Sequence, residues 1–357
     1  MGYSRRRFVL GAVLVLISIV AISGLRLAWE WRQALSDVDA MIVPTRSLPP
    51  TQQPTQVADA PQQGKGLAAT TQELQPTPLP VPSAEPNPEH LEPINILLLG
   101  TDTRPDQGVT RTDAMILVHI NPASGRVSML SLPRDLWVEI PGFGHQRINA
   151  AYPIGEKQLG HGYGGALAKE TVGNLVGVPV QHFILVDFEG FKKVIDTIGG
   201  VTLDVQKPID DPNYPTDDYN TIAVHFSAGK QHMDGERALI YARTRHADSD
   251  FGRNQRQQQV LMAIFEAVRD QGLLKQITSL DDYTGALRDY VRTDISRSDM
   301  LSLARMADKF QTDNIQRYAI GPDMIVGLQQ PATFAADPAA LRAVVAEMTG
   351  AGAAVEP

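Results

Sequence analysis

Residues 94–102 read Ile-Asn-Ile-Leu-Leu-Leu-Gly-Thr-Asp, an apolar run that stops at Gly100 and is followed by the carboxylate of Asp102. A short apolar run bounded by glycine predicts a strand that is buried on both faces. Such a strand lies inside a sheet, so the rest of the fold must pack around it.

The segments that follow predict an α/β fold. Two more apolar strands are expected at 114–120 and 126–132, and the Asn-Pro-Ala-Ser-Gly sequence at 121–125 is typical of a hairpin turn. Further strands are expected at 182–188, 201–205 and 315–320, and helices at 164–176, 189–198, 234–241, 251–270, 298–310 and 338–348. A hairpin among alternating strands and helices indicates an α/β/α sandwich, in which helices cover both faces of a central mixed sheet.

The chain ahead of this domain begins with a predicted membrane anchor. Three arginines at positions 5–7 precede eighteen uncharged residues, which as a helix would span about 27 Å, close to the hydrocarbon thickness. We expect a transmembrane signal-anchor helix at 8–28, with residues 1–7 in the cytoplasm and the rest of the chain outside. A cleaved signal peptide and a twin-arginine export signal are the alternatives.

A polar segment separates this anchor from the domain. Residues 29–43 form a juxtamembrane stretch, and residues 44–93 contain 12 of the 25 prolines of the chain. Because such a composition buries too little apolar surface to order itself, we expect a disordered linker that holds the domain off the membrane. The catalytic domain is then expected at 94–349, with a disordered tail at 350–357.

Composition excludes several classes of protein. The 357 residues include 32 basic and 40 acidic side chains, a net charge of −8, which argues against a nucleic-acid partner. The chain has no cysteine, so disulfide scaffolds, zinc–thiolate sites, iron–sulfur clusters and thiol nucleophiles are excluded. The P-loop pattern of many nucleotide-binding enzymes is also missing from the sequence.

Two carboxylates follow or begin neighbouring predicted strands. Asp102 comes just after the first strand and Asp113 just before the second. If these strands are neighbours, both carboxylates lie at one edge of the sheet, where paired oxygen ligands suit Mg²⁺. The alternative is that each aspartate caps main-chain N–H groups at a turn.

The arginines indicate a binding site more strongly than the two carboxylates do. Residues 237–256 hold five arginines, two acids and no lysine, within a domain of negative charge. The guanidinium fork binds phosphate oxygens in pairs, which lysine cannot do. The candidate anion-binding residues are Arg243, Arg245, Arg253 and Arg256, with Arg111 and Arg134 near the carboxylates. A solvated charged surface and structural ion pairs are the alternatives.

These motifs resemble the LytR–CpsA–Psr family of envelope phosphotransferases across residues 94–265. The matching segments are Asn-Ile-Leu-Leu-Leu-Gly-Thr-Asp at 95–102, Arg-Thr-Asp at 111–113, Ser-Leu-Pro-Arg-Asp at 131–135, Ile-Gly-Gly-Val at 198–201, Leu-Ile-Tyr-Ala-Arg-Thr-Arg at 239–245 and the run from Asp250 to Gln259. The resemblance implies a sandwich fold with an apolar cavity for a polyprenyl chain.

The resemblance also implies a reaction and its partners. A glycopolymer phosphate would move from a polyprenyl diphosphate carrier to a peptidoglycan hydroxyl, at the membrane and with Mg²⁺ as cofactor. It implies that Asp102 and Asp113 hold the metal. The residues implied to contact the diphosphate are Arg111, Arg134, Arg243, Arg245, Arg253 and Arg256, and those implied to be catalytic are Asp102, Arg245 and Asp250. A polyprenyl-diphosphate glycan diphosphatase and a non-enzymatic wall-binding regulatory protein are the alternative functions.

Overall fold

The computed structural model describes part of the chain. The described residues are 30–44, 46–48, 92–102, 111–216, 220–245, 250–270, 287–306, 314–327 and 333–351. The predicted cytoplasmic end at 1–7, the predicted membrane helix at 8–28, most of the predicted linker and most of the predicted tail lie outside these ranges. Within them, none of the helices combines the length and the apolar character needed to cross a membrane.

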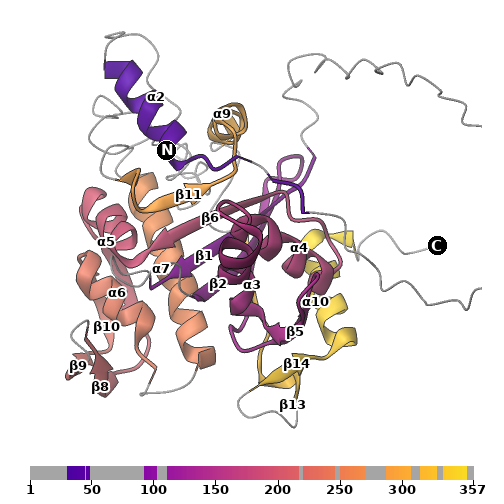
Figure 1. Ribbon diagram of the computed structural model, residues 1–357. Coiled ribbons are helices and arrows are strands. Elements are labelled where there is room, and N and C mark those ends of the chain that lie inside the picture. The colour runs from indigo at the N-terminus through magenta and orange to yellow at the C-terminus, as the bar shows by residue number, and fades with distance from the viewer. Residues whose placement is uncertain are drawn as a thin grey trace, which may run out of the picture.

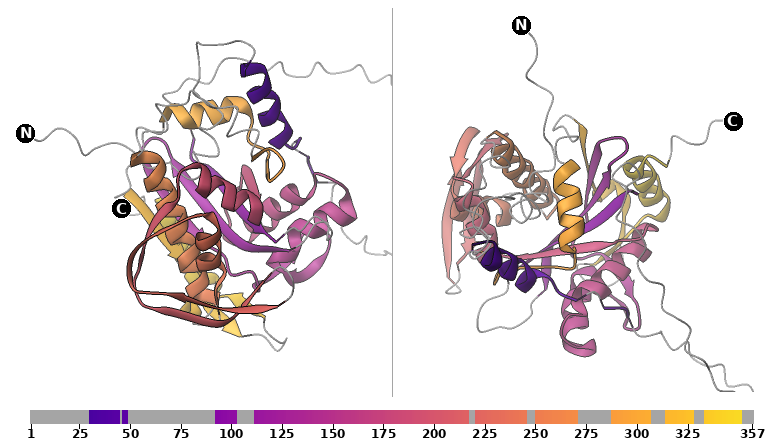
Figure 2. Two further views of the ribbon diagram at one scale, coloured as in Figure 1. Left: turned by 90° about the vertical axis from the view of Figure 1, so that its left-hand side faces the viewer. Right: turned by 90° about the horizontal axis from the view of Figure 1, so that it is seen from above.

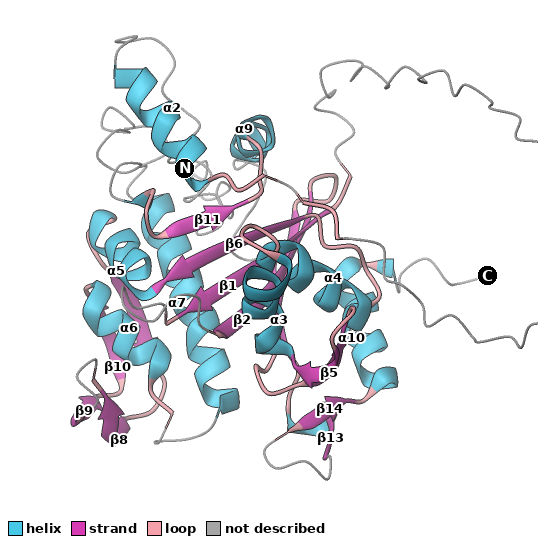
Figure 3. Ribbon diagram, viewed as in Figure 1, coloured by secondary structure: helices cyan, strands magenta, loops and turns pink. Residues whose placement is uncertain are grey.

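A six-stranded mixed sheet forms the centre of the domain (Figures 1 and 3). Its order is β11-β6-β1-β2-β3-β12, and its strands are β1 (Ile94–Thr101), β2 (Thr112–Asn121), β3 (Arg126–Ser131), β6 (His182–Asp187), β11 (Val291–Thr293) and β12 (Ile315–Ala319). β1 pairs with β2 in antiparallel and with β6 in parallel fashion, while β12 runs parallel to β3. The predicted hairpin is confirmed, since β2 and β3 pair through the turn at 122–125.

The first strand is buried on both faces because successive side chains of a strand point to opposite sides. Ile96 joins an apolar cluster on one face of the sheet, while Leu97 and Leu99 join a second cluster on the other. All three side chains are at most 2% exposed. This double burial explains the run of leucines at the start of the domain, where no polar residue alternates with them.

Helices cover both faces of the sheet (Figure 2). One face packs against α3 (Ala151–Ile154), α4 (Gly164–Val176) and α10 (Pro338–Thr349), with a π-helix at Gly155–Leu159 and 3₁₀ turns at Ile148–Ala150 and Pro322–Met324. The other face packs against α5 (Phe188–Thr197), α6 (Gly235–Arg243), α7 (Asp250–Asp270) and α9 (Arg297–Met306). The prediction of a mixed sheet with flanking helices is therefore confirmed.

Four small antiparallel ribbons lie outside this sheet. They pair β4 (Trp137–Ile140) with β5 (Gly144–Arg147), β7 (Val201–Val205) with β10 (Gly229–Met233), β8 (Ile209–Pro215) with β9 (Thr221–Phe226), and β13 (Ile325–Gly327) with β14 (Phe334–Ala336). The strand predicted at 201–205 is therefore present, but it pairs with β10 and not with the central sheet.

The segment expected to be juxtamembrane forms a helix that packs on the domain. Helix α2 (Glu30–Met41) buries Val38 and Met41, which are 0% and 3% exposed, in the cluster with α7 and α9. Directly after it, the Val43 N–H donates to the carbonyl of Thr293 in β11 over 2.7 Å. Residues 30–43 are thus a packed part of the domain, on the edge strand of the sheet (Figure 1).

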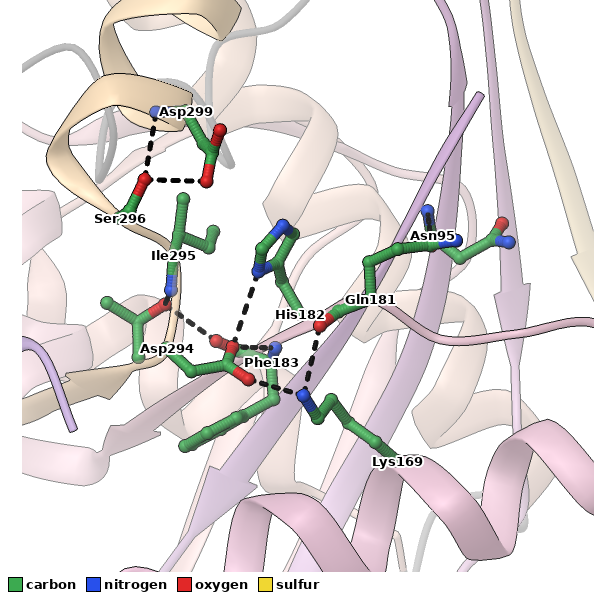
Figure 4. A network of polar contacts seen from close by, with 10 residues as sticks. Asn95, Lys169, Gln181, His182, Phe183, Asp294, Ile295, Ser296 and Asp299 are labelled. Atoms are coloured by element: carbon green, nitrogen blue, oxygen red, sulfur yellow. Dashed lines mark hydrogen bonds and ion pairs between the residues drawn. The ribbon is translucent and has the colours of Figure 1, made fainter. Parts of the chain in front are cut away.

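A buried ionic network joins α4 to the same edge of the sheet (Figure 4). Asp294, directly after β11, accepts a hydrogen bond of 2.9 Å from the Phe183 N–H, contacts the Lys169 ammonium and lies 3.6 Å from His182 Nδ1. Burial alone would raise the pKa of Asp294, but its contacts with His182 and Lys169 lower it. The carboxylate is therefore held ionised and links three elements.

Helix α4 approaches the sheet closely because its first turn carries glycine. A Cβ atom at Gly165 would overlap the ring of Phe183 in β6. We therefore expect Gly165→Ala to lower the free energy of unfolding by about 1–3 kcal/mol, since overpacking outweighs any gain in helix propensity. Denaturant unfolding followed by circular dichroism measures the change.

Gly327→Ala is the matched control for this substitution. An added Cβ at Gly327 meets no atom within 4 Å, and the residue does not have a positive φ. Its unfolding should match that of the wild type within about 0.5 kcal/mol. Equal stability of the Gly165→Ala protein would contradict the close packing of α4 on β6.

Candidate active site

The two predicted metal carboxylates meet at one edge of the sheet. Thr101 at the end of β1 pairs with Thr112 at the start of β2, and the register shifts beside this pair, at Asp113. Asp102 follows β1 directly, so both carboxylates belong to this edge of the sheet. Their side chains are 31% and 40% exposed. Both line a polar cavity of about 840 Å³. The two strands are neighbours, and the carboxylates lie at one edge of the sheet, as the sequence argument predicts.

Arg134 binds the carboxylates of this edge together. It follows β3, which runs in the same direction as β1, and its Nη1 lies 3.0 Å from Asp113 Oδ1. Its Nε lies 3.4 Å from Asp135 and 3.8 Å from Asp250. Burial would lower the pKa of Arg134, but the three carboxylates raise it. Arg134 is thus a fixed positive charge at the centre of the cavity wall.

Arg243 is held in place by aromatic rings. It is the last residue of α6, and its guanidinium carbon lies 4.3 Å from the centre of the Phe188 ring. Its Nη1 donates to the Tyr214 hydroxyl over 3.1 Å, and its Nη2 lies 3.9 Å from Asp102 Oδ2. Stacking restricts the side chain and keeps the guanidinium beside Asp102.

Arg253 is a buried cation in the first turn of α7. Its side chain is 7% exposed and its Nη1 lies 3.1 Å from Asp250 Oδ1. Its Nε is buried and makes no hydrogen bond with the described residues. Burial lowers the pKa of Arg253, and the neighbouring Arg134 and Arg245 lower it further, against the opposing effect of Asp250. Cations crowded in this way favour an anionic ligand.

The other three predicted arginines differ in position. Arg111 is exposed and lines the polar cavity, and Arg245 is exposed two residues beyond the end of α6. Arg256 is only 4% exposed and donates to the carbonyls of Tyr241 and Thr244. Its direct contact with a diphosphate stays a prediction.

Sequence reasoning missed other residues that line the polar cavity. They are Gln146 and Arg147 from β5 and Lys157 and Gln158 from the π-helix. Arg147 Nη1 also lies 3.3 Å from Asp135 Oδ1. These residues are dispersed in weakly patterned segments, so their gathering depends on how α3 and β5 fold back onto the sheet.

Sequence reasoning also left an apolar cavity unassigned. About 120 Å³ of space lies between the sheet and helices α5 to α7. Its lining includes Leu98, Gly100 and Ala114 from β1 and β2, and Ala242 and Leu261 from α6 and α7. Gly100 and Ala242 directly precede Thr101 and Arg243 in the chain, so this cavity reaches the charged edge of the sheet.

Small side chains keep this apolar space open. A Cβ at Gly100 would lie 3.0 Å from the Cβ of Ala114 on the paired strand. Larger residues at these positions would fill the space that the cavity occupies. The glycine and alanines were therefore the available sequence signal for the cavity, although their pattern does not distinguish it from close strand packing.

The donor set of the polar cavity is compatible with Mg²⁺. Asp102 and Asp113 supply two carboxylates, and Mg²⁺ is often bound by one or two carboxylates together with substrate phosphates and water. Among the described residues, no group of three or more His, Cys, Asp or Glu side chains has a metal-binding arrangement. A metal here would therefore complete its coordination with substrate oxygens and water.

Comparison with known proteins identifies a family and several relatives with transferase names. A family model described as the LytR_cpsA_psr family matches residues 60–347. The polyisoprenyl-teichoic acid–peptidoglycan teichoic acid transferase TagU of Oceanobacillus iheyensis is 38% identical over 213 residues, or 59% of this chain and 61% of that protein. TagU of Enterococcus faecalis is 33% identical over 223 residues, or 61% of this chain and 67% of that protein.

The match to a third relative has a similar extent. TagV of Bacillus subtilis, which carries the same transferase name, is 32% identical over 243 residues, or 66% of this chain and 59% of that protein. The chain thus spans between 59% and 67% of the length of the curated relatives it matches.

Solved structures have the same fold. The crystal structure of B. subtilis TagV matches with a TM-score of 0.57 at 29% identity, over 72% of this chain and 98% of that one. The crystal structure of B. subtilis TagU matches with a TM-score of 0.53 at 27% identity, over 73% and 96%. Since the family model covers well over half of the residues, the chain belongs to the LytR–CpsA–Psr family.

Proposed function

We propose that the protein is a membrane-anchored phosphotransferase of cell-wall assembly. It moves a glycopolymer phosphate from a polyprenyl diphosphate carrier to a peptidoglycan hydroxyl. The observation that carries this proposal is that an apolar cavity lies next to a polar one rich in arginine and carboxylate, since Ala114 of the first lining directly follows Asp113 of the second. This arrangement suits a ligand with a hydrocarbon chain and a diphosphate, and the related TagU and TagV proteins are named as teichoic acid transferases.

The residues at the charged edge of the sheet have distinct tasks in this reaction. The acceptor hydroxyl attacks the phosphorus that carries the glycopolymer, a new oxygen–phosphorus bond forms, and the bond to the polyprenyl phosphate breaks. Arg134, Arg243 and Arg253 neutralise the diphosphate and the leaving polyprenyl phosphate. Asp102 or Asp250 accepts the hydroxyl proton. Because the acceptor hydroxyl is itself the nucleophile, the protein needs no nucleophilic side chain.

Mg²⁺ is the proposed cofactor, held by Asp102 and Asp113. When bound, it supplies further neutralisation of the diphosphate oxygens. Before a metal binds, the ion pair of 3.0 Å with Arg134 keeps the Asp113 carboxylate oriented toward the cavity.

The anchor and the location are part of the proposal. The uncharged run at 8–25, with three arginines before it, supports a single membrane span with the catalytic domain outside the cytoplasm. Recovery of the full-length protein in the soluble fraction after cell lysis would contradict this placement.

The arginine cluster gives the first test. Arg245→Ala should lower the transfer rate about 100-fold or more, because charge stabilisation at the reacting phosphates is lost. The transfer rate of Arg245→Lys should lie between those of the wild type and Arg245→Ala, since lysine keeps the charge but lacks the guanidinium fork. A transfer assay with a purified lipid-linked glycan and peptidoglycan measures both.

Arg317→Ala is the control for these variants, because Arg317 is an exposed arginine on β12 outside both cavities. It should transfer at the wild-type rate. Wild-type activity of Arg245→Ala would contradict the assignment. Product that forms equally well without peptidoglycan would favour the diphosphatase, and binding without any product would favour the wall-binding regulatory protein.

Removal of divalent cations gives a second test. Transfer should stop in excess chelator and return when Mg²⁺ is added, because without the cation the carboxylates of Asp102 and Asp113 repel the diphosphate. Asp113→Asn should raise the Mg²⁺ concentration needed for half-maximal rate, measured by titration of the chelated enzyme. Full activity in chelator would rule out the metal.

The apolar cavity gives a third test. Leu261→Trp should fill it and raise KM for a long-chain polyprenyl donor about tenfold, while a donor with a short chain is affected much less. Leu261→Met, which nearly conserves volume, should behave as the wild type for both donors. An equal rise in KM for long-chain and short-chain donors would contradict binding of the lipid chain in this cavity.

A further inference from the structure

Thr244 separates the half-buried Arg243 from the exposed Arg245 at the end of α6. It is the C-terminal cap of that helix, is 0% exposed, and stands between Arg243 and Arg245. Its own N–H donates to the Ile240 carbonyl over 2.9 Å. The direction in which both arginines leave the helix therefore depends on how Thr244 is held.

Asp211 holds Thr244 from one side. This residue of β8 is only 1% exposed, and its Oδ2 accepts from the Thr244 hydroxyl and from the Arg245 N–H, the latter over 3.3 Å. Its Oδ1 accepts from the Asn213 N–H over 3.1 Å. One buried carboxylate thus fixes both the cap residue and the main chain of the arginine that follows.

A bulge in β8 aims two side chains at α6 together. Residues three apart on a regular strand point to opposite faces. The pairing of β8 with β9 shifts register between Asp211 and Tyr214, and both residues are buried. Tyr214 accepts from Arg243, so the same irregular strand orients one arginine directly and the other through its main chain. Bulges commonly re-aim side chains in this way near active sites.

Arg256 holds Thr244 from the other side. It projects from α7, and its Nε donates to the Tyr241 carbonyl over 3.0 Å while its Nη2 donates to the Thr244 carbonyl. The last carbonyls of a helix have no partner within the helix and carry its negative dipole end. The buried guanidinium of Arg256 caps α6 because it donates to these main-chain carbonyls.

We propose that Asp211 and Arg256 are positioning residues for the phosphate-binding arginines. Together they clamp the cap of α6 between a buried anion and a buried cation, and so set the spacing of Arg243 and Arg245. This inference rests on the proposed function only in its choice of ligand, a diphosphate. It assigns Arg256 a structural contact with the main chain in place of direct contact with the ligand.

Thr244→Val removes the hydroxyl at nearly constant volume and tests the clamp. We expect it to weaken binding of inorganic pyrophosphate, measured by calorimetry on the full chain with Mg²⁺ present, about tenfold. Asp211→Ala should weaken it at least as much. Thr244→Ser keeps the hydroxyl and should restore affinity to within about twofold of the wild type.

The matched control is a buried threonine in β11. Thr293 is 3% exposed, and its hydroxyl donates to the Phe183 carbonyl over 2.7 Å and accepts from the Ile295 N–H over 3.1 Å. Thr293→Val should lower the melting temperature at least as much as Thr244→Val does, because it loses two buried hydrogen bonds where Thr244→Val loses the bond to Asp211. It should leave pyrophosphate affinity unchanged, since it lies away from α6.

The outcomes separate this inference from the proposed function. Wild-type pyrophosphate affinity in folded Thr244→Val or Asp211→Ala protein would overturn the clamp, whatever the activity. Equal loss of affinity in Thr293→Val would also overturn it, because the effect would then be general destabilisation. A wild-type protein that binds pyrophosphate but transfers no glycan would overturn the function and leave the clamp standing.

Discussion

The pairing of β1 with its two neighbours is the constraint on which the site depends. Thr101 is paired with Thr112 of β2 on one side and with Asp187 of β6 on the other. This register brings the end of β1 and the start of β2 to one edge, and β3 delivers Arg134 to the same edge. A shift of one residue would turn the leucines of β1 to the wrong clusters, so burial and site geometry are fixed by the same hydrogen bonds.

Carboxylates at this edge of the sheet offset the repulsion between its arginines. Burial lowers the pKa of Arg253, and the neighbouring Arg134 and Arg245 lower it further. Asp113 and Asp250 offset the repulsion between the guanidinium groups through ion pairs with Arg134 and Arg253 at 3.0 to 3.8 Å. These ion pairs hold the cations in place at the edge of the sheet.

The sequence predicts those parts of the site that follow from strand order. The position of Asp102, Asp113 and Arg134 at one edge needs only adjacent strands of the right direction. The clamp on Thr244 has no such signal, because β8 is a short polar strand and nothing in its sequence marks Asp211 as a buried residue. The apolar cavity likewise arises from the spacing of whole helices over the sheet, which local patterns do not contain.

Helix α2 was missed for a different reason. Val38, Met41 and Ile42 have the spacing of one helix face, but their surroundings are polar and no motif marks them. Its docking changes the topology of the chain, since residues 30–44 and 46–48 already lie on the domain that residue 92 enters again. Residues 48 and 92, on either side of the proline-rich stretch, therefore both lie on one folded body. A change in the length of that stretch would leave the distance between residue 30 and the edge that carries Asp102 unchanged.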